Sequence, residues 1–417
     1  MRCLRVLFAL MLVIFLFILS PAKLLAEPDI RLGPVRAYPG LTIKGDWTDN
    51  YFLYKYGEVE ERDEWITTIS PGLLLQLPMR RHMLQLEYRA DYFAHAEYTY
   101  ADVAEHFVGG FLNLDFPGGL KIKAGHEYRI TSYPPLWYID PEHRDPRHKY
   151  RSNKPNGTIS YRFADRYEVA VSYYYQNARF KIARDQVDDY GKHDVAFTLF
   201  YRILPKTWIL VEAGYYRVSR PRPFILEPII TADRDSDNYR AWLGLRWEPG
   251  AKLVGTIKGG YIARRYDEKG GGEDEDNFGL RCELDYHLTP YDQITLTAFR
   301  EVLETYITTM ASPYFGSSYI SSGFDLDLKH RFTYKLSGSL RAHYTNENYH
   351  EAYLGMGEER MDNRYIFGGS IDYQIQDWLS CGLGYHYLNN DCNYDWQEYD
   401  ENRVMLYLSA TLPGPTF

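Results

Sequence analysis

The stretch HMLQLEYRADYFAH, at residues 82–95, alternates apolar and polar side chains along most of its length. One face of an extended chain would carry Leu84, Leu86, Tyr88, Ala90 and Tyr92. The opposite face would carry Gln85, Glu87, Arg89 and Asp91. Because successive side chains of a strand point to opposite faces, the pattern predicts a β-strand with one apolar and one charged surface.

The same alternation recurs along the chain, most clearly at 278–287 and 365–375. No stretch after residue 40 has the period of a convincing amphipathic helix. The candidate strands cover 41–56, 63–77, 82–97, 103–116, 120–131, 154–163, 166–180, 190–203, 207–219, 238–248, 251–266, 276–288, 292–305, 317–331, 334–346, 362–375, 378–389 and 401–412.

The connections between these strands alternate between two kinds. Every second one is short and mostly rich in turn-forming residues: 78–81, 117–119, 164–165, 205–206, 249–250, 289–291, 332–333 and 376–377. Most of the others are longer and polar: 132–153, 181–189, 220–237, 267–275, 347–361 and 390–400. This asymmetry is typical of outer-membrane barrels, whose short turns face the periplasm. The sequence therefore predicts an all-β fold, a transmembrane antiparallel up-and-down β-barrel of about 18 strands (16–18).

Soluble β folds are the alternative. An immunoglobulin-like sandwich takes only about 100 residues. A propeller would show a repeat of about 40–50 residues with a signature, and none is found. Neither fold explains a charged face on nearly every strand.

The composition fits a wall with one apolar and one wet face. The 417 residues include 40 Tyr, 20 Phe and 8 Trp, yet 25% of residues are charged. Mean hydropathy is −0.44, well below that expected of a helical membrane protein.

The N-terminus reads as a secretory signal peptide over residues 1–26. Arg2 and Arg5 precede fourteen apolar residues at 6–19, and small residues follow, with cleavage expected after Ala26. Fourteen apolar residues are short for a membrane-spanning helix. We expect residues 27–40 to form a periplasmic N-terminal segment and residues 41–417 to form the barrel.

Removal of residues 1–26 deletes Arg2, Arg5 and Lys23 but no acid, so the formal charge moves from −9 to −12. An acidic exported protein is a poor nucleic-acid binder. The remaining Cys282, Cys381 and Cys392 form neither a disulfide framework nor a metal cluster.

The apolar face should contact lipid, with aromatic residues near the strand ends forming two girdles. The aromatic residues expected there are Trp47, Trp65, Tyr88, Trp208, Trp247, Tyr373 and Trp378.

The polar face should line the barrel interior. The residues predicted to line a pore are Arg89, Lys121, Lys123, Arg129, Arg162, Arg202, Glu212, Arg240, Arg246, Lys258, Arg281, Glu283, Asp285, Asp325, Asp327, Arg341 and Asp372. Further inward charges are Glu87, Asp91, Glu127, Glu168, Glu301, Lys329 and Lys335. Isolated buried charges are prohibitively costly, so this lining implies water, cross-strand ion pairs, or both.

Barrels of sixteen to eighteen strands usually enclose an aqueous channel. A lining charged in both signs argues against strong ion selectivity and suits neutral or weakly charged solutes such as saccharides. We therefore expect a porin-like channel rather than an enzyme, without cofactors. Its expected partners are outer-membrane lipid and lipopolysaccharide, the saccharide solute, and a periplasmic export partner.

The longest loop contains Tyr133, Trp137 and Tyr138, which could fold over the pore and stack on sugars. The equal alternative is that this loop packs on its neighbour at 220–237. The acidic segments 233–237 and 273–276 could hold Ca²⁺ but lack EF-hand spacing, so solvated loops are the better reading.

Two other functions stay open. A barrel-embedded hydrolase would need one compact catalytic cluster, and no G-x-S-x-G or H-E-x-x-H string occurs. A structural or partner-docking barrel would have its lumen plugged, for example by residues 27–40.

Several segments also resemble a known family. They are GDWTDNYFLYK at 45–55, ISPGLLLQLPMRRHMLQLEYRADYFAHAEY at 69–98, NGTISYRFADRYEVAVSYYYQNARF at 156–180 and ENRVMLYLSATL at 401–412. These are similar to the outer-membrane β-barrel porins found with exopolysaccharide and exosortase systems. The final Phe417 suits barrel-assembly machinery, although Pro413 and Pro415 make the tail irregular. The resemblance implies an outer-membrane pore whose substrate is a nascent secreted polysaccharide.

Overall fold

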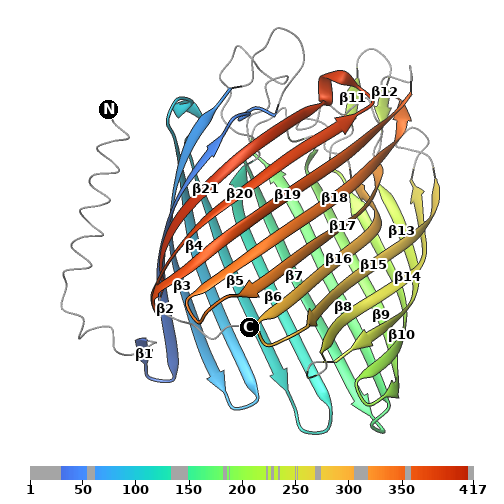
Figure 1. The fold of residues 1–417 in the computed structure, drawn as a ribbon. Coiled ribbons are helices and arrows are strands. Elements are labelled where there is room, and N and C mark those ends of the chain that lie inside the picture. Colours follow the sequence, from blue (N-terminus) through green and yellow to red (C-terminus); the bar gives the residue numbers. More distant parts are fainter. Residues whose placement is uncertain are drawn as a thin grey trace.

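The computed structural model of the chain is a barrel of tilted strands with tight turns at one end and longer connections at the other (Figure 1). These ends are called the turn end and the loop end below. The residues described are 30–53, 62–132, 149–181, 186, 188–221, 224–226, 230–232, 235–248, 250, 252–267, 274–304, 318–352 and 358–411.

Eighteen of the described strands form the wall, as predicted. They are β2 (Val35–Thr48), β3 (Glu64–Met79), β4 (His82–His95), β5 (Val103–Asp115), β6 (Leu120–Ser132), β7 (Lys149–Phe163), β8 (Tyr167–Phe180), β9 (Tyr190–Leu204), β10 (Thr207–Ser219), β13 (Ser236–Trp247), β14 (Leu253–Tyr266), β15 (Glu275–His287), β16 (Asp292–Glu304), β17 (Ser318–Arg331), β18 (Leu336–Ala352), β19 (Glu359–Gln376), β20 (Leu379–Cys392) and β21 (Tyr399–Thr411).

The sheet closes on itself because β2 pairs with both β3 and β21. Leu41 lies opposite Pro71 on one side and Ala410 on the other. A closed sheet leaves no edge with unpaired backbone groups, which is the condition for strands to cross a bilayer. The wall is thus a closed antiparallel barrel, confirming the predicted fold class.

Several of the tight turns contain residues with positive φ. Gly118 and Gly119 have φ of +97° and +94°, and a Cβ on Gly119 would lie 2.3 Å from the carbonyl oxygen of Arg162. Ala164 and Asp165, at φ of +48° and +54°, form the next turn at the same end. Short connections of this kind fix the register of each hairpin.

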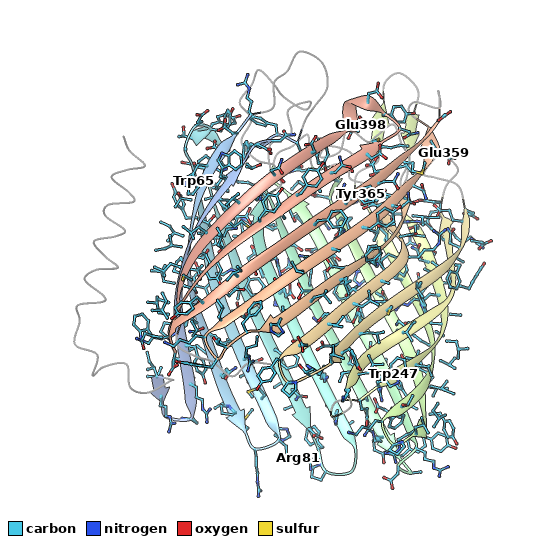
Figure 2. All side chains as sticks on the ribbon, in the orientation of Figure 1. Trp65, Arg81, Trp247, Glu359, Tyr365 and Glu398 are labelled. Carbon is cyan, nitrogen blue, oxygen red and sulfur yellow. The ribbon has the colours of Figure 1, made fainter. Side chains whose placement is uncertain are left out.

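The outward face is apolar. Leu243, Leu340 and Leu406 expose 63%, 64% and 57% of their surface, a cost in water that lipid would remove. Trp65 lies towards the loop end and Trp247 towards the turn end (Figure 2), where aromatic girdles are expected. The fold and this surface together place the barrel in the outer membrane. No helix among the described residues is long and apolar enough to cross a membrane.

The strand bounds differ from the prediction by a few residues, most at β2. That strand begins at Val35, six residues before the expected start, and forms a small hairpin with β1 (Ile30–Leu32). The alternation is weak there because Pro39 and Gly40 interrupt it. A second short hairpin, β11 (Phe224–Leu226) and β12 (Ile230–Ala232), was not predicted. The expected signal peptide at 1–26 lies outside the described residues.

The wall is not uniform between β15 and β16. Their ladder joins residues 280–287 to residues 293–300, so the loop-end part of β15 pairs with β14 but has no β16 partner in the described ladder. The loop-end halves of β16 and β17 instead place Val302 and Ile320 against Trp242 and Ile262 on the inner face of β13 and β14. We call these two loop-end halves the inner arm. It makes the wall two layers thick at this place.

Candidate functional site

The seventeen residues predicted to line a pore all project from the inner face of the barrel, opposite the exposed apolar residues. Strand register carries this orientation from one strand to the next: Glu87 on β4 lies opposite Gly109 on β5, which lies opposite Glu127 on β6. That the seventeen side chains line a conducting pore stays a prediction. Their surroundings divide the inner face into two sectors.

The first is the packed sector, formed by the inner face of β8–β10, β13 and β14. Near its turn end, Trp208 is fully buried, with the guanidinium carbons of Arg162, Arg246 and Arg202 at 4.7, 5.1 and 5.6 Å from its ring centre. Glu168 accepts hydrogen bonds from Arg162 at 2.9 Å and from Arg246 at 3.0 Å. Glu168 thus pairs with two of the three cations that surround the Trp208 ring.

The prediction for Trp208 was wrong. It was expected in an outer aromatic girdle because it lies near a strand end. Its side chain instead shares the inner face with Leu210 and Glu212, two and four residues along β10. Position along a strand does not decide the face. The alternation does, and the charged Glu212 would have identified the inner face.

Farther up the packed sector, a second network crosses four strands. Arg240 donates to Asp194 and to Glu212, and Lys258 donates to Glu212 at 2.7 Å. These side chains are 10–19% exposed. Each charge has an opposite partner within hydrogen-bond distance, which is the condition for burying it at tolerable cost.

At the loop end, the inner arm contributes Glu304, the acid of a third network. Glu304 on β16 accepts from Arg264 on β14 and from Arg220, which follows β10, the latter at 3.3 Å. The side chains of both arginines are almost fully buried. The ion pairs and the Val302 contacts together hold the arm against the wall, which narrows the interior on this side.

The second is the open sector, formed by the inner face of β4–β7 and the turn-end halves of β15–β18. Here many charged side chains are about half exposed: Arg89 47%, Arg129 46%, and Arg281 and Glu283 57% and 56%. Ion pairs commonly join residues two apart on one strand, as Arg89–Asp91 at 3.0 Å and Arg281–Glu283 at 2.9 Å do. Lys121 and Lys123 are also exposed here.

The remaining predicted acids are also engaged. Asp285 accepts from Gln293 at 2.8 Å, and Asp327 lies 3.7 Å from Lys329. Asp325 pairs with Arg341, and Asp372 accepts from the hydroxyl of Tyr407. Ion pairs or hydrogen bonds therefore engage the predicted acids of the inner face, and the expectation that water satisfies the other charges stays a prediction.

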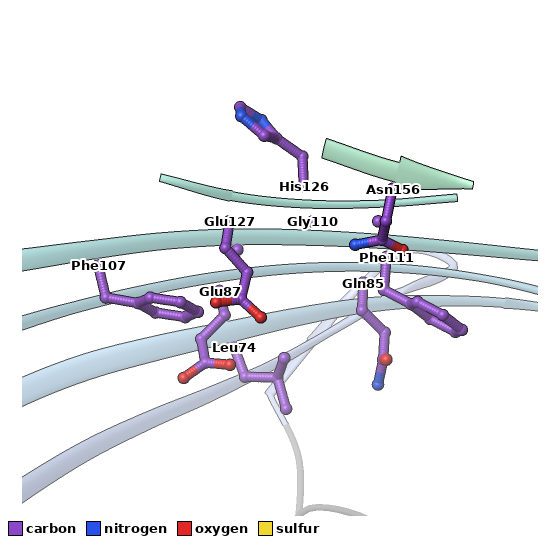
Figure 3. A pocket seen from close by; sticks show the side chains of 11 residues that line it. Leu74, Gln85, Glu87, Phe107, Gly110, Phe111, His126, Glu127 and Asn156 are labelled. Carbon is purple, nitrogen blue, oxygen red and sulfur yellow. The ribbon is translucent and has the colours of Figure 1, made fainter. Parts of the chain in front are cut away.

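A hollow of about 320 Å³ lies in the open sector, over β3–β7 (Figure 3). Its side-chain lining includes Glu87, Glu127, Phe107, Phe111 and Asn156. His126 also borders it, but its side chain points to the opposite face of the sheet, as Figure 3 shows.

The aromatic residues of this hollow were missed from the sequence. Phe107, Gly109, Phe111 and Asn113 alternate on one face of β5, and register places Phe107 opposite Arg89. The aromatic residues named from the sequence were those near strand ends, and neither Phe107 nor Phe111 was considered. Phe111 is 39% exposed inside the barrel.

The loop residues proposed to stack on sugars, Tyr133, Trp137 and Tyr138, lie outside the described residues, so the constriction hypothesis stays a prediction. Of the acidic segments, the described carboxylates of Asp235 and Asp237 lie 3.8 and 3.0 Å from Arg217, and Asp276 pairs with Arg265. Asp237 and Asp276 lie near the starts of β13 and β15, whereas residues 233, 234 and 273 lie outside the described residues, so the interpretation of these segments as solvated loops stays a prediction.

One arrangement of side chains resembles the acid, base and hydroxyl group of a hydrolase. Asp325 lies 3.3 Å from Nδ1 of His343, whose Nε2 lies 2.7 Å from the hydroxyl of Thr345. Thr345 is only 4% exposed and sits beneath its neighbours, so a substrate carbonyl could not reach its hydroxyl. A nucleophile needs that approach, and the arrangement therefore lacks the geometry of a catalytic site.

The chain was compared with families and with solved structures. A family model described as "Putative beta-barrel porin 2" matches residues 29–412. The outer membrane protein OpdK from Pseudomonas aeruginosa aligns with a TM-score of 0.46 at 9% identity, over 90% of this chain and 99% of that one. OccAB4 from Acinetobacter baumannii aligns with a TM-score of 0.45 at 12% identity, over 90% and 98%. No curated protein matches the chain.

Proposed function

We propose, from the premise that the chain belongs to the beta-barrel porin family matched over residues 29–412, that this outer-membrane channel passes oligosaccharide or polysaccharide chains. Residues 1–26 would direct its export, and the part of the predicted 27–40 segment that precedes β2 would lie in the periplasm, where an export partner would deliver the solute.

The observation that carries the proposal is the pairing of charges in the open sector. Arg89, Arg129 and Arg281 each contact a carboxylate two residues away on the same strand, while staying about half exposed. Alternating donors and acceptors at short spacing create a polar surface with little net field. Such a surface favours a solute that offers many hydroxyl groups over one that carries a net charge.

The identity of the solute as a secreted polysaccharide is supported by the resemblance of segments such as 69–98 and 156–180 to porins found with exopolysaccharide and exosortase systems. A long neutral chain suits the elongated open sector, because each sugar unit could exchange one set of polar contacts for the next. The loop with Tyr133, Trp137 and Tyr138 would act as an entry or exit platform.

Single-channel recording of the refolded protein in planar bilayers tests this function, with maltohexaose as the neutral probe. We expect stable open steps that maltohexaose interrupts in a concentration-dependent way. Open steps that neither maltohexaose nor dextran oligosaccharides interrupt would contradict the saccharide part of the proposal. Deletion of residues 133–146 should change the conductance if that loop narrows the pore.

The packed sector and inner arm favour a second candidate, a closed barrel that serves as a docking platform. Val302 and Ile320 bury apolar surface in the interior, and Glu304 ties the arm to Arg264. Under this reading the refolded protein would give no open steps at all. The same recording therefore separates the two functions.

A further inference from the structure

We infer that the hollow over β3–β7 is a binding subsite for one neutral pyranose unit of a saccharide chain, with Phe111 as its apolar platform and Glu87 and Glu127 as its hydroxyl acceptors. The inference rests on the proposed function and deepens it by locating the contact. It concerns the described inner wall and does not involve the loop at 133–148.

Glycines create the space. Gly109 and Gly125 occupy inward positions on β5 and β6, where other residues would project into the hollow. A Cβ on Gly109 would lie 2.9 Å from Cζ of Phe107, and one on Gly125 would lie 2.9 Å from Nδ2 of Asn156. Both are closer than ordinary contacts, so the two glycines are needed for this packing. The resulting volume of about 320 Å³ is at the small end of ligand sites.

The apolar part of the recognition comes from Phe111. Its ring faces the interior and is 39% exposed, whereas the outward aromatic residues have lipid to cover them. Because the ring leaves apolar surface open to the lumen, a ligand that covers it removes this surface from water and gains affinity. The C–H face of a pyranose ring is apolar and slightly positive, which matches the negative face of an aromatic ring.

The polar part comes from two carboxylates on either side of Gly109. Glu87 and Glu127 are separated by two ladder spacings, about 10 Å between Cα atoms, and both border the hollow. Glu127 accepts from Arg129 at 3.0 Å, while Glu87 accepts no hydrogen bond from the described residues. An ionised carboxylate only accepts hydrogen bonds, and sugar hydroxyls donate them.

Amide groups complete the rim. Gln85 lies opposite Phe111 in the register, and Asn156 lies opposite Gly125. Each amide can donate and accept, as a hydroxyl-rich ring requires. Above the hollow, the guanidinium carbons of Arg89 and Arg129 lie 5.7 and 4.9 Å from the centre of the Phe107 ring. Since carboxylates flank the floor, a neutral sugar fits better than a uronate, which both acids would repel.

Titration calorimetry of the full-length protein in detergent tests the subsite without requiring conduction. The probes are maltohexaose and, as the anionic counterpart, hexagalacturonate. Phe111→Ala should weaken maltohexaose binding about tenfold, and Glu87→Gln should weaken it about threefold and narrow the preference over hexagalacturonate. The matched control is Phe299→Ala, which removes an inward ring from β16 on the other side of the barrel.

In planar bilayers, the time that maltohexaose stays bound should fall about tenfold in the Phe111→Ala channel and stay unchanged in the Phe299→Ala channel. Unchanged binding in both hollow variants, or equal loss in Phe299→Ala, would overturn the subsite while leaving the channel intact. If the protein bound maltohexaose in calorimetry but gave no open steps in bilayers, the proposed channel function would be wrong and the proposed subsite would stand. A requirement for Ca²⁺ in maltohexaose binding would also overturn the inference, because the carboxylates would then hold a cation.

Discussion

Arg240 on β13 reaches across β10 to Asp194 on β9, with its Nη2 2.8 Å from the Asp194 Oδ1. The strand between them carries Gly214 in register with Arg240, and a Cβ at this glycine would lie 2.6 Å from the Arg240 Nε. The guanidinium therefore lies over β10 only because that position has no side chain. Sequence alone gives little reason to connect these three residues, which are far apart in the chain.

Replacement of Gly214 by leucine should break this crossing. Asp194 would lose its partner inside the packed sector, and separating a buried ion pair costs about 3 kcal/mol. We expect a loss of that size in the free energy of unfolding, measured by urea titration of tryptophan fluorescence in lipid vesicles. The control is Gly157→Ala, whose Cβ would have its nearest contact at 3.6 Å. A Gly214→Leu protein as stable as this control would contradict the structural role of the crossing.

An arginine on the outward face should destabilise the barrel more than an arginine on the inner face. Leu243 is 63% exposed near the middle of β13, so Leu243→Arg would place a charge in hydrocarbon at a cost of about 2–4 kcal/mol. Thr297 lies on the inner face between Glu283 and Asp325 in the register, so Thr297→Arg should be tolerated. Folding yield and unfolding free energy in vesicles measure both. Equal destabilisation by the two substitutions would contradict the assigned faces.

An interior that carries charges of both signs should select weakly between ions. Changing the sign of charges in the open sector should therefore change the ion selectivity of the channel. Lys121 and Lys123 are both exposed on the inner face of β6. The double substitution Lys121→Glu and Lys123→Glu changes the formal interior charge by four units, so the channel should become cation-selective. The reversal potential in a tenfold KCl gradient measures this. The same double change at outward Ile122 and Ala124 should impair folding rather than selectivity, and an unshifted potential in the lysine variant would place those residues away from the ion path.

One buried acid organises the loop end. Glu64 is 2% exposed and accepts backbone N–H groups of Ala96, Glu97 and Tyr98 at 2.9, 3.2 and 2.9 Å. Glu64→Ala would leave these donors without an acceptor, at a cost of about 1–3 kcal/mol. We expect chymotrypsin to cleave the variant at Tyr98 or Tyr100 under conditions where the parent resists. Glu64→Gln is the control because it keeps one acceptor oxygen. If the Glu64→Ala protein resisted chymotrypsin as well as this control does, Glu64 would not be needed to hold residues 96–98 in place.

Much of the architecture follows from period-two alternation and from turn residues, which are local signals. Strand β10 was predicted with its observed bounds, and the turn at Gly118 and Gly119 is visible in the sequence because few residues other than glycine adopt such φ values. The start of β2 was missed because Pro39 and Gly40 weaken the alternation, although both residues remain in the wall through pairing with β3.

The interior was predicted less completely, because its organisation depends on which strands face one another across the lumen. The residues on the inner face followed from alternation, but nothing local indicates that Val302 packs on Trp242 or that Glu304 reaches Arg264. The inward position of Trp208 was missed because aromatic residues near strand ends were expected in the girdles, and Phe111 was not considered. Their neighbours on the same face, Glu212 and Asn113, carried the missing signal.

We expect a water-filled path to run along the open sector of the barrel. Cysteine modification during single-channel recording tests whether it does. Lys123→Cys is introduced after Cys282, Cys381 and Cys392 are replaced by serine, with Ile122→Cys as the adjacent outward control. We expect a water-soluble cationic methanethiosulfonate to lower the conductance of the Lys123→Cys channel in one step and to leave the Ile122→Cys channel unchanged. An open channel in which Lys123→Cys does not react, or reacts without any change in conductance, would contradict it.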